Sequence, residues 1–353
     1  MNIYEENGVT ILEMIRPNNF HVHLRETEQL NSLVSFSARQ FGHIMAMPNL
    51  EKPLTSVVDA VNYCLAIQVA GQMWNFQSHV ALYLTDKTSK EDIREAVTHE
   101  LLAGKLYPSG VTTNSSDGVT DILNLYKLFA VMEEFNFPLS IHCEDPNHVI
   151  DIFDREKVFI DKYLEDIVIE FPELRIIFEH VSTKEGVQFV KNMPSNVVAT
   201  ITPQHMLCNR NDLLAKGICP SKFCFPVVNR KIDQDAVIAA ATSGHEKFFL
   251  GTDSAPHSDS LKYCEGGKGG CFTELYAIEL YAEAFERADA LDDRFEAFAS
   301  FNGSDFYGLP RNTAKLRLVR QKQQISQSIK AGDNMNVIPF LAGKTLQWER
   351  APQ

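Results

Sequence analysis

Eight short apolar segments recur along the chain, and most are separated by segments with the periodicity of amphipathic helices. The predicted strands cover residues 19–25, 43–48, 79–85, 104–107, 138–143, 175–180, 196–202 and 247–252. The predicted helices cover 55–70, 90–103, 120–135, 152–170, 184–192 and 232–243, whereas 28–40 has a weaker helical pattern. Strands that alternate with helices pair in parallel through right-handed crossovers. We therefore expect an α/β fold, a closed (β/α)8 TIM barrel. An open doubly wound sheet is the alternative, but it usually has a glycine-rich turn after its first strand, and none is present.

The remaining segments extend this barrel prediction. Thr88 with Glu91, and Ser182 with Glu185, have the Ser/Thr-x-x-Glu spacing of a capping box, which predicts helix starts there. A further helix is expected over residues 273–299. No linker or low-complexity tract divides the chain, so residues 1–353 are predicted to form a single domain. Residues 311–353 are expected to form a C-terminal appendage packed on the barrel, with a strand over 336–341.

The chain is acidic, since 33 Lys and Arg residues against 46 Asp and Glu residues give a net charge of −13. Nucleic-acid binding needs clustered positive charge, so we expect no nucleic-acid partner. No apolar run approaches the ~18 residues that span a bilayer, and residues 1–10 lack the apolar core of a secretory signal. The seven cysteines show no Cys-x-x-Cys pair, which favours reduced thiols. These features predict a cytoplasmic protein without a membrane partner.

Polar side chains stand at the ends of several predicted strands. His21 and His23 are two residues apart, so in an extended strand both imidazoles lie on one face. Four later strands end in Lys105, His142, His180 and Asp253, after runs that are otherwise mostly apolar. In a (β/α)8 barrel the C-terminal ends of the strands meet at one rim. We therefore predict a metal centre there, held by these six residues.

The number of ligands predicts two metal ions. The residues from the first and last strands would hold one ion, and His142 with His180 would hold the other. Lys105 is the only candidate for a bridge, because a buried lysine beside cations has a lowered pKa and its free amine can react with carbon dioxide to give a carboxylate-like carbamate. Zinc suits ligation by histidine and carboxylate. We expect two Zn²⁺ per subunit, bridged by N6-carboxylated Lys105 and by a hydroxide whose pKa is near neutrality.

A set of short motifs gives the chain a specific resemblance. The motifs are FHVHLR at 20–25, MPNL at 47–50, KLYP at 105–108, TTNS at 112–115, IH at 141–142, FEH at 178–180, TPQH at 202–205, GTDSAPH at 251–257 and PFLAGKT at 339–345. With them the chain resembles the dihydroorotases, the shorter bacterial-type branch of the amidohydrolase superfamily, over nearly its whole length. The resemblance implies reversible interconversion of L-dihydroorotate and N-carbamoyl-L-aspartate in pyrimidine biosynthesis. It also implies two zinc ions, a carboxylated lysine and a homodimer.

The resemblance also implies roles for individual residues around the small-molecule substrate. Asp253 is the expected general acid and base. Arg25 lies two residues beyond His23 and can grip the substrate carboxylate with two hydrogen bonds. The residues expected to contact the substrate are Arg25, Asn49, Thr112, Thr113, Phe225, His257 and Gly269. The two threonines lie on a loop expected to close over the substrate. Phe225 and Gly269 stand where the family commonly has Leu and Ala, and both are expected to act through backbone atoms.

Two other functions compete with this prediction. Another hydrolase on the same metal scaffold, such as a hydantoinase or a phosphotriesterase-like enzyme, would not need the carboxylate-binding cluster of Arg25, Asn49 and His257. A catalytically dead binding or regulatory protein would be expected to have lost metal ligands, whereas all six predicted ligands are present. The sequence therefore favours a cyclic amidohydrolase that acts on an anionic substrate.

Overall fold

The eight predicted strands form a closed ring of parallel strands in the computed structural model, which describes residues 1–333 and 335–351. The barrel strands are β3 (Asn19–Val22), β4 (His43–Ala46), β5 (Gln77–Val80), β6 (Leu82–Tyr83), β7 (Gly104–Leu106), β8 (Leu139–Ile141), β9 (Ile176–Phe178), β10 (Val197–Ile201) and β11 (Phe248–Leu250). β5 and β6 belong to one predicted strand, which pairs first with β4 and then with β7. The prediction of a (β/α)8 barrel is confirmed.

The ring closes between the first and last barrel strands. The backbone N–H of Asp253 donates to the carbonyl of His21 (2.9 Å), and the N–H of His23 donates to the carbonyl of Ser254 (3.0 Å). Val22 and Ser254 form a parallel bridge at the same place. These bonds join β3 to the segment after β11, which an open sheet would leave apart.

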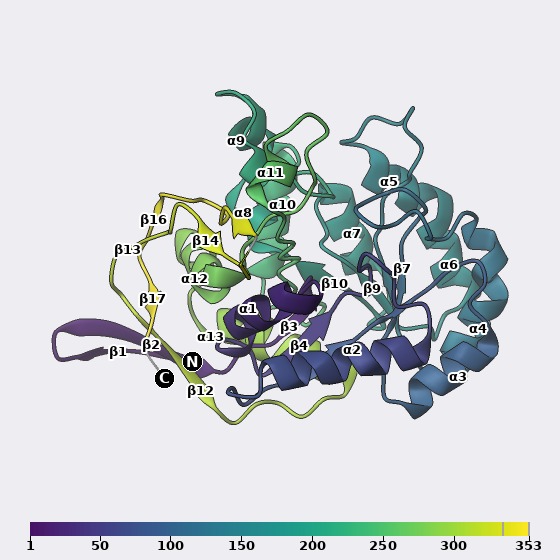
Figure 1. The fold of residues 1–353 in the computed structure, drawn as a ribbon, viewed down its shortest axis with the longest axis horizontal. Coiled ribbons are helices and arrows are strands. Elements are labelled where there is room, and N and C mark those ends of the chain that lie inside the picture. The colour runs from purple at the N-terminus through teal and green to yellow at the C-terminus, as the bar shows by residue number, and fades with distance from the viewer. Residues whose placement is uncertain (334, 352–353) are drawn as a thin grey trace.

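Most helices of the first part of the chain lie between successive barrel strands, and the last four follow the final barrel strand (Figure 1). They are α1 (Thr27–Ala38), α2 (Val57–Ala70), α3 (Lys90–Thr98), α4 (Tyr126–Glu134), α5 (Arg155–Phe159), α6 (Glu165–Glu170), α7 (Lys184–Asn192), α8 (Pro203–Leu207), α9 (Arg210–Leu214), α10 (Lys231–Ala241), α11 (Asp259–Lys262), α12 (Ala277–Arg287), α13 (Asp293–Glu296) and α14 (Asn302–Tyr307). No helix among the described residues has both the length and the apolar character needed to cross a membrane.

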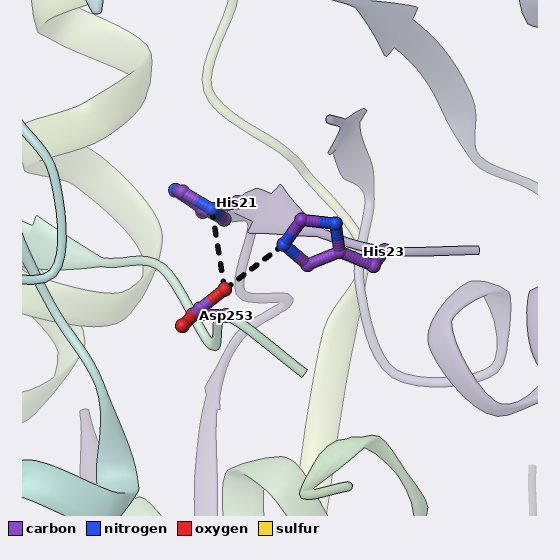
Figure 2. Close-up of side chains that lie close together, drawn as sticks. All are labelled: His21, His23 and Asp253. Carbon is purple, nitrogen blue, oxygen red and sulfur yellow. Dashed lines mark hydrogen bonds and ion pairs between the residues drawn. The ribbon is translucent and has the colours of Figure 1, made fainter. Parts of the chain in front are cut away.

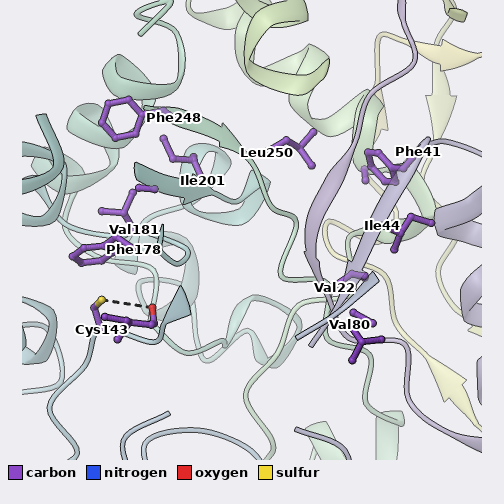
Figure 3. Close-up of a cluster of buried hydrophobic side chains, with 14 of the residues drawn as sticks. Val22, Phe41, Ile44, Val80, Cys143, Phe178, Val181, Ile201, Phe248 and Leu250 are labelled. Carbon is purple, nitrogen blue, oxygen red and sulfur yellow. Dashed lines mark hydrogen bonds between the residues drawn. The ribbon is translucent and has the colours of Figure 1, made fainter. Parts of the chain in front are cut away.

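The core fills the space between strands and helices. Figure 3 shows part of it, where Val22, Ile44 and Val80 come from three adjacent strands and Phe178, Ile201 and Leu250 come from three others. All are essentially inaccessible to water. Burying side chains of this kind stabilises the fold by ~1.5–3 kcal/mol each, so the apolar runs themselves hold the rim residues in place.

Several predicted boundaries were wrong for local reasons. The first strand ends at Val22, not at residue 25, and Arg25 has a positive φ of 60°. Residues 28–40, whose pattern was weak, form most of α1. The helix predicted over 273–299 is interrupted after α12, since Asp289 has a φ of 53° that a helix cannot contain. The strand predicted over 336–341 is only β15 (Asn336–Val337).

The caps of α3 and α7 each lie one residue later than predicted, and of the two helices only α3 has a capping box. Ser89 caps α3 and shares a reciprocal capping box with Asp92. Thr183 caps α7 by accepting a hydrogen bond from the N–H of Gly186. The helix starts themselves were predicted correctly, because neighbouring Ser and Thr residues offer alternative caps.

The two ends of the chain share one antiparallel sheet outside the barrel. It consists of β1 (Asn2–Glu6), β2 (Val9–Ile15), β12 (Lys315–Val319) and β17 (Glu349–Arg350). Two small ladders complete the C-terminal segment: β13 (Gln323–Gln324) with β16 (Thr345–Leu346), and β14 (Ile329–Lys330) with β15. The N-terminal strands had not been predicted. Their pairing with β12 joins residues about 300 positions apart, a relation that no local pattern encodes.

We expect this terminal sheet to contribute to the stability of the whole chain. Leu318 lies opposite Leu12 in the register, and both are fully buried. Leu318→Ala should lower the free energy of unfolding by about 2–5 kcal/mol, the usual cost of such a truncation. Urea denaturation followed by circular dichroism measures the effect. Arg317→Ala, on the exposed face of the same strand, is the control and should cost under about 1 kcal/mol. Equal losses would show that the sheet does not pack as a core element.

Candidate active site

His21, His23 and Asp253 lie together where β3 meets the end of β11 (Figure 2). Oδ1 of Asp253 lies 3.3 Å from Nε2 of His21 and 3.0 Å from Nε2 of His23. The candidate ligand atoms of all three lie within 4.8 Å of one another. Burial opposes the charge of Asp253, but hydrogen bonds from His21 and His23 outweigh it and hold the pKa of Asp253 well below its usual value. The group offers two imidazoles and a carboxylate, a donor set that suits Zn²⁺.

Four imidazole rings form a row across this rim of the barrel. Ring centroids are 5.6 Å apart for His23 and His21, 5.1 Å for His21 and His180, and 4.6 Å for His180 and His142. His180 and Asp253 both have positive φ values, 43° and 45°, directly after their strands. Such conformations cost free energy in non-glycine residues and are found where a site needs them. The structure thus brings together histidines from three separate strand ends.

Lys105 lies in β7, fully buried. Its Nζ has no hydrogen-bond partner among the described residues, and the same holds for buried Nδ1 of His180. Burial lowers the pKa of Lys105, although nearby Glu179 opposes the shift. Buried polar atoms without partners are uncommon in folded proteins. An unpaired amine and an unpaired imidazole nitrogen at one rim fit a site that metal ions and a carboxylated lysine would complete.

One small cavity lies beside His23 and Asp253. Every residue predicted to contact the substrate lines it, namely Arg25, Asn49, Thr112, Thr113, Phe225, His257 and Gly269. The cavity therefore combines the carboxylate of Asp253 with a guanidinium, an amide and two hydroxyl groups. Its lining can bind a small polar molecule and present one of its atoms to the rim.

One side of this cavity is cationic, opposite in charge to the carboxylate of Asp253. Nε of Arg25 donates to the carbonyl of Pro256 (2.9 Å), which fixes the guanidinium. Burial lowers the pKa of Arg25 only to about 10, so it stays protonated at neutral pH. Nε2 of His257 lies 3.0 Å from the carbonyl oxygen of Gly269 and 3.2 Å from Nη2 of Arg25. Burial, together with the charge of Arg25, lowers the pKa of His257 to about 2, which leaves a neutral ring. Arg25 thus supplies the cavity's positive charge.

The loop that carries Thr112 and Thr113 is held against the cavity. Nδ2 of Asn49 donates to the carbonyl of Thr113 (3.0 Å), and Oδ1 of Asn49 accepts from the hydroxyl of Tyr107 (3.0 Å). Within the loop, the hydroxyl of Ser115 donates to the carbonyl of Thr112 (2.6 Å). This loop is therefore an ordered cover with its own hydrogen bonds, and Asn49 links it to the barrel.

Known proteins resemble the chain throughout. Residues 15–317 match the sequence profile of the amidohydrolase family. A dihydroorotase from Shewanella loihica is 46% identical over 342 residues, which is 97% of this chain and 99% of that protein. The chain belongs to the dihydroorotase branch of the amidohydrolase family.

Solved structures of dihydroorotases agree with this assignment. The enzyme from Campylobacter jejuni superposes with a TM-score of 0.89 at 30% identity, with 99% of both chains covered. The enzyme from Saccharomyces cerevisiae, crystallised with 5-fluoroorotic acid, has a TM-score of 0.88 at 30% identity and covers 97% of this chain and 99% of that one. The dihydroorotase fold therefore extends over the barrel and the terminal sheet alike.

Two glutamates of this dihydroorotase-branch site had no predicted role. Nδ1 of His21 donates to Glu179 (2.7 Å), and Nε2 of His142 donates to Glu144 (2.7 Å). Burial alone would raise the pKa of Glu179, but His21 and Lys105 lower it to about 2. A carboxylate on one imidazole nitrogen fixes the ring and leaves the other nitrogen for a metal. The sequence contains one signal for Glu179, which stands near the end of an otherwise mostly apolar predicted strand.

Lys262 was also missed by the sequence analysis. Its buried Nζ donates to the carbonyls of Phe223 (3.1 Å), Lys268 (3.1 Å) and Gly270 (2.5 Å). The ammonium thus ties together the two backbone segments that carry Phe225 and Gly269. No spacing rule relates these carbonyls to Lys262, since they come from two loops.

His205, which stands outside the predicted metal set, has both ring nitrogens engaged. Nδ1 lies 2.7 Å from the hydroxyl of Thr202, and Nε2 donates to the carbonyl of Pro226 (3.0 Å). The ring therefore supports the backbone next to Phe225.

We predict that Glu179 controls how tightly the rim binds metal. Glu179→Gln keeps the shape but loses the charge that holds His21, so affinity for Zn²⁺ should fall about 10–100-fold. Competition with a chromophoric chelator measures this affinity without any assay of turnover. Glu279→Gln is the matched control, because Glu279 is equally buried but accepts from the backbone of Arg350, far from the histidines. An equal fall in both variants would contradict a specific role for Glu179.

Proposed function

We propose that this chain catalyses the reversible ring opening of L-dihydroorotate to N-carbamoyl-L-aspartate, a reaction of pyrimidine biosynthesis. Membership of the dihydroorotase branch supports the reaction. The single observation that carries it is that Asp253 and the protonated Arg25 line the same small cavity. Dihydroorotate carries a cyclic amide and a carboxylate, so one molecule can use both groups. A neutral ester or an unsubstituted hydantoin would leave the guanidinium of Arg25 without an anionic partner.

We infer that two zinc ions complete the site. His21, His23 and Asp253 would hold one ion, His142 and His180 the other, and carboxylated Lys105 would lie between them. The unpaired Nζ of Lys105 and the glutamates that orient His21 and His142 support this arrangement. When bound, such ions polarise a carbonyl group and lower the pKa of water, which supplies a nucleophile at neutral pH.

Asp253 moves the proton in the proposed reaction. During ring opening its carboxylate takes a proton from the attacking water and delivers it to the leaving amide nitrogen. During cyclisation it removes the proton from the carbamoyl amide. General acid–base transfer of this kind contributes ~10²–10⁴-fold to the rate. Its low pKa keeps Asp253 ionised, the form that accepts a proton.

The cavity residues hold the substrate in the orientation that this transfer requires. Arg25 grips the substrate carboxylate through a charge-assisted pair of hydrogen bonds, and Asn49 adds an amide donor. His257 and the backbone at Gly269 and Phe225 complete the carboxylate side and the ring side of the pocket. Buried placement strengthens each of these electrostatic contacts.

Thr112 and Thr113 cover the substrate in this proposal. Their loop is joined to the barrel through Asn49, so a substrate that engages Asn49 also affects the loop. Closure excludes water and holds the hydroxyl donors in place. The proposed form of the enzyme is a homodimer.

An assay of L-dihydroorotate ring opening tests the proposed function directly. Turnover should be measurable in the metal-loaded protein, be lost with a chelator and return on adding Zn²⁺. Arg25→Ala should lower kcat/KM about 10–150-fold, the loss of a ~1.5–3 kcal/mol contact to a charged group. Arg25→Lys keeps the positive charge but loses the two-pronged guanidinium, so its kcat/KM should lie between those of the wild-type protein and Arg25→Ala. Unchanged kcat/KM in Arg25→Ala would exclude the carboxylate assignment.

Carboxylation of Lys105 has its own test. Lys105→Ala should lose nearly all turnover and regain part of it with acetate or propionate, which restore a carboxylate in the space left by the side chain. In the wild-type protein, ¹³C-labelled bicarbonate should give a carbamate signal by NMR that Lys105→Ala lacks. Lys191→Ala, on the outer helix α7, should change neither result. A wild-type protein with full turnover and no carbamate signal would refute the assignment.

A further inference from the structure

Lys262 is a buried cation that the proposed reaction does not use. It is the last residue of α11 and is only 6% exposed. Its Nζ donates to the carbonyls of Phe223, Lys268 and Gly270, and a protonated lysine has three hydrogens to donate. The ammonium therefore spends all of its donors on backbone carbonyls and none on a carboxylate. Burying a charge costs free energy, so packing alone would be served better by an apolar side chain.

The loop that follows α11 needs such an anchor. Residues 264–271 read CEGGKGGC, so half of them are glycines, and glycine loses the most conformational freedom when a backbone is ordered. The side chains of residues 263–266 and of Lys268 are exposed, so burial of apolar groups does not fix this loop. The N–H of Gly270 donates to the carbonyl of Phe223 (2.8 Å). Lys262 reinforces this one bond, because it donates to the same carbonyl and to two carbonyls of the loop.

The two segments that Lys262 joins meet again at the substrate cavity. Phe225 and Gly269 both line it. A Cβ atom placed on Gly269 would lie 2.6 Å from Cδ2 of Phe225, so the ring already fills the space beside the glycine. The carbonyl oxygen of Gly269 also lies 3.0 Å from Nε2 of His257. Groups packed this closely cannot shift independently, so the position of the loop sets the shape of this side of the cavity.

We propose that Lys262 is a positioning residue for substrate binding. By holding the loop after α11 against residues 223–225, it sets where the backbone at Phe225 and Gly269 meets the substrate. This inference rests on the proposed function, since it concerns how the substrate of that reaction is held. All donors of Lys262 end on backbone carbonyls, so its effect on the reaction is through binding.

Steady-state kinetics of Lys262→Ala test this role. KM for L-dihydroorotate should rise about 3–12-fold, the loss of one hydrogen bond between backbone and substrate. The value of kcat should change less than about twofold, because loss of binding that is equal in the ground state and the transition state raises KM alone. Lys222→Ala is the matched control. Nζ of Lys222 also donates to a backbone carbonyl, that of Asp212 (3.2 Å), but at an exposed position, so KM should not change.

Chemical rescue separates the ammonium from a general structural role. Truncation of Lys262 to alanine removes a propylammonium-sized part of the side chain. Lys262 also lines an outer cavity of about 910 Å³ through which a small amine can enter. Propylammonium should therefore lower the raised KM of Lys262→Ala. Tetramethylammonium carries the same charge but has no N–H to donate, so it should not. Neither ion should change KM of the wild-type protein or of Lys222→Ala.

Hydrogen exchange tests the anchoring of the loop without any assay of turnover. The amide of Gly270, which donates to Phe223, should exchange faster in Lys262→Ala, and propylammonium should slow it again. Failure of the proposed function would show as a wild-type protein without ring-opening activity. Failure of this proposal would show as an active Lys262→Ala variant with wild-type KM and wild-type exchange, or with a raised KM that propylammonium does not lower.

Discussion

The closure of the barrel and the assembly of the site depend on the same backbone hydrogen bonds. The N–H of Asp253 donates to the carbonyl of His21, and the N–H of His23 donates to the carbonyl of Ser254. These bonds complete the ring, and they also place the carboxylate of Asp253 between two imidazoles. A barrel that did not close would separate these ligands onto opposite edges of a sheet. The junction between β3 and the segment after β11 therefore serves both the closure of the barrel and the assembly of the site.

A polar network lies next to this junction. Nδ2 of Asn19 donates to the hydroxyl of Thr252 (2.8 Å), which in turn donates to Glu274 (2.9 Å), and the N–H of Thr252 donates to Oδ1 of Asn19 (3.0 Å). All three residues are buried. A buried polar group without partners costs free energy, whereas a satisfied network fixes one arrangement. At the rim, by contrast, hydrogen-bonding groups are left unsatisfied, because Lys105 and His180 keep unpaired atoms where ligands are proposed to bind.

The outer layers of the molecule serve other purposes than the rim. The terminal sheet joins both ends of the chain, and α2 packs one face against the core. Neither carries a residue of the rim, so the packing of these elements can vary without changing the reacting groups. The connection that does exist is short in sequence, since the segment that carries Asn49 leads directly into α2.

The sequence by itself determined the strand–helix alternation and the polar residues at the strand ends, because hydrophobic periodicity is a local property and a charged residue in an apolar run stands out. His21, Lys105 and Asp253 could be singled out in this way. The residues that line the cavity were predicted from the motifs shared with the family. Only the tertiary structure decided which carboxylate holds which imidazole, that Lys262 ties two loops together, and that β2 pairs with β12. These relations join residues that are distant along the chain, and their geometry follows from packing, which no spacing rule contains. The positive φ of Arg25 and of Asp289 belongs to the same class, since packing around each residue sets a backbone conformation that the strand or helix predicted there cannot contain.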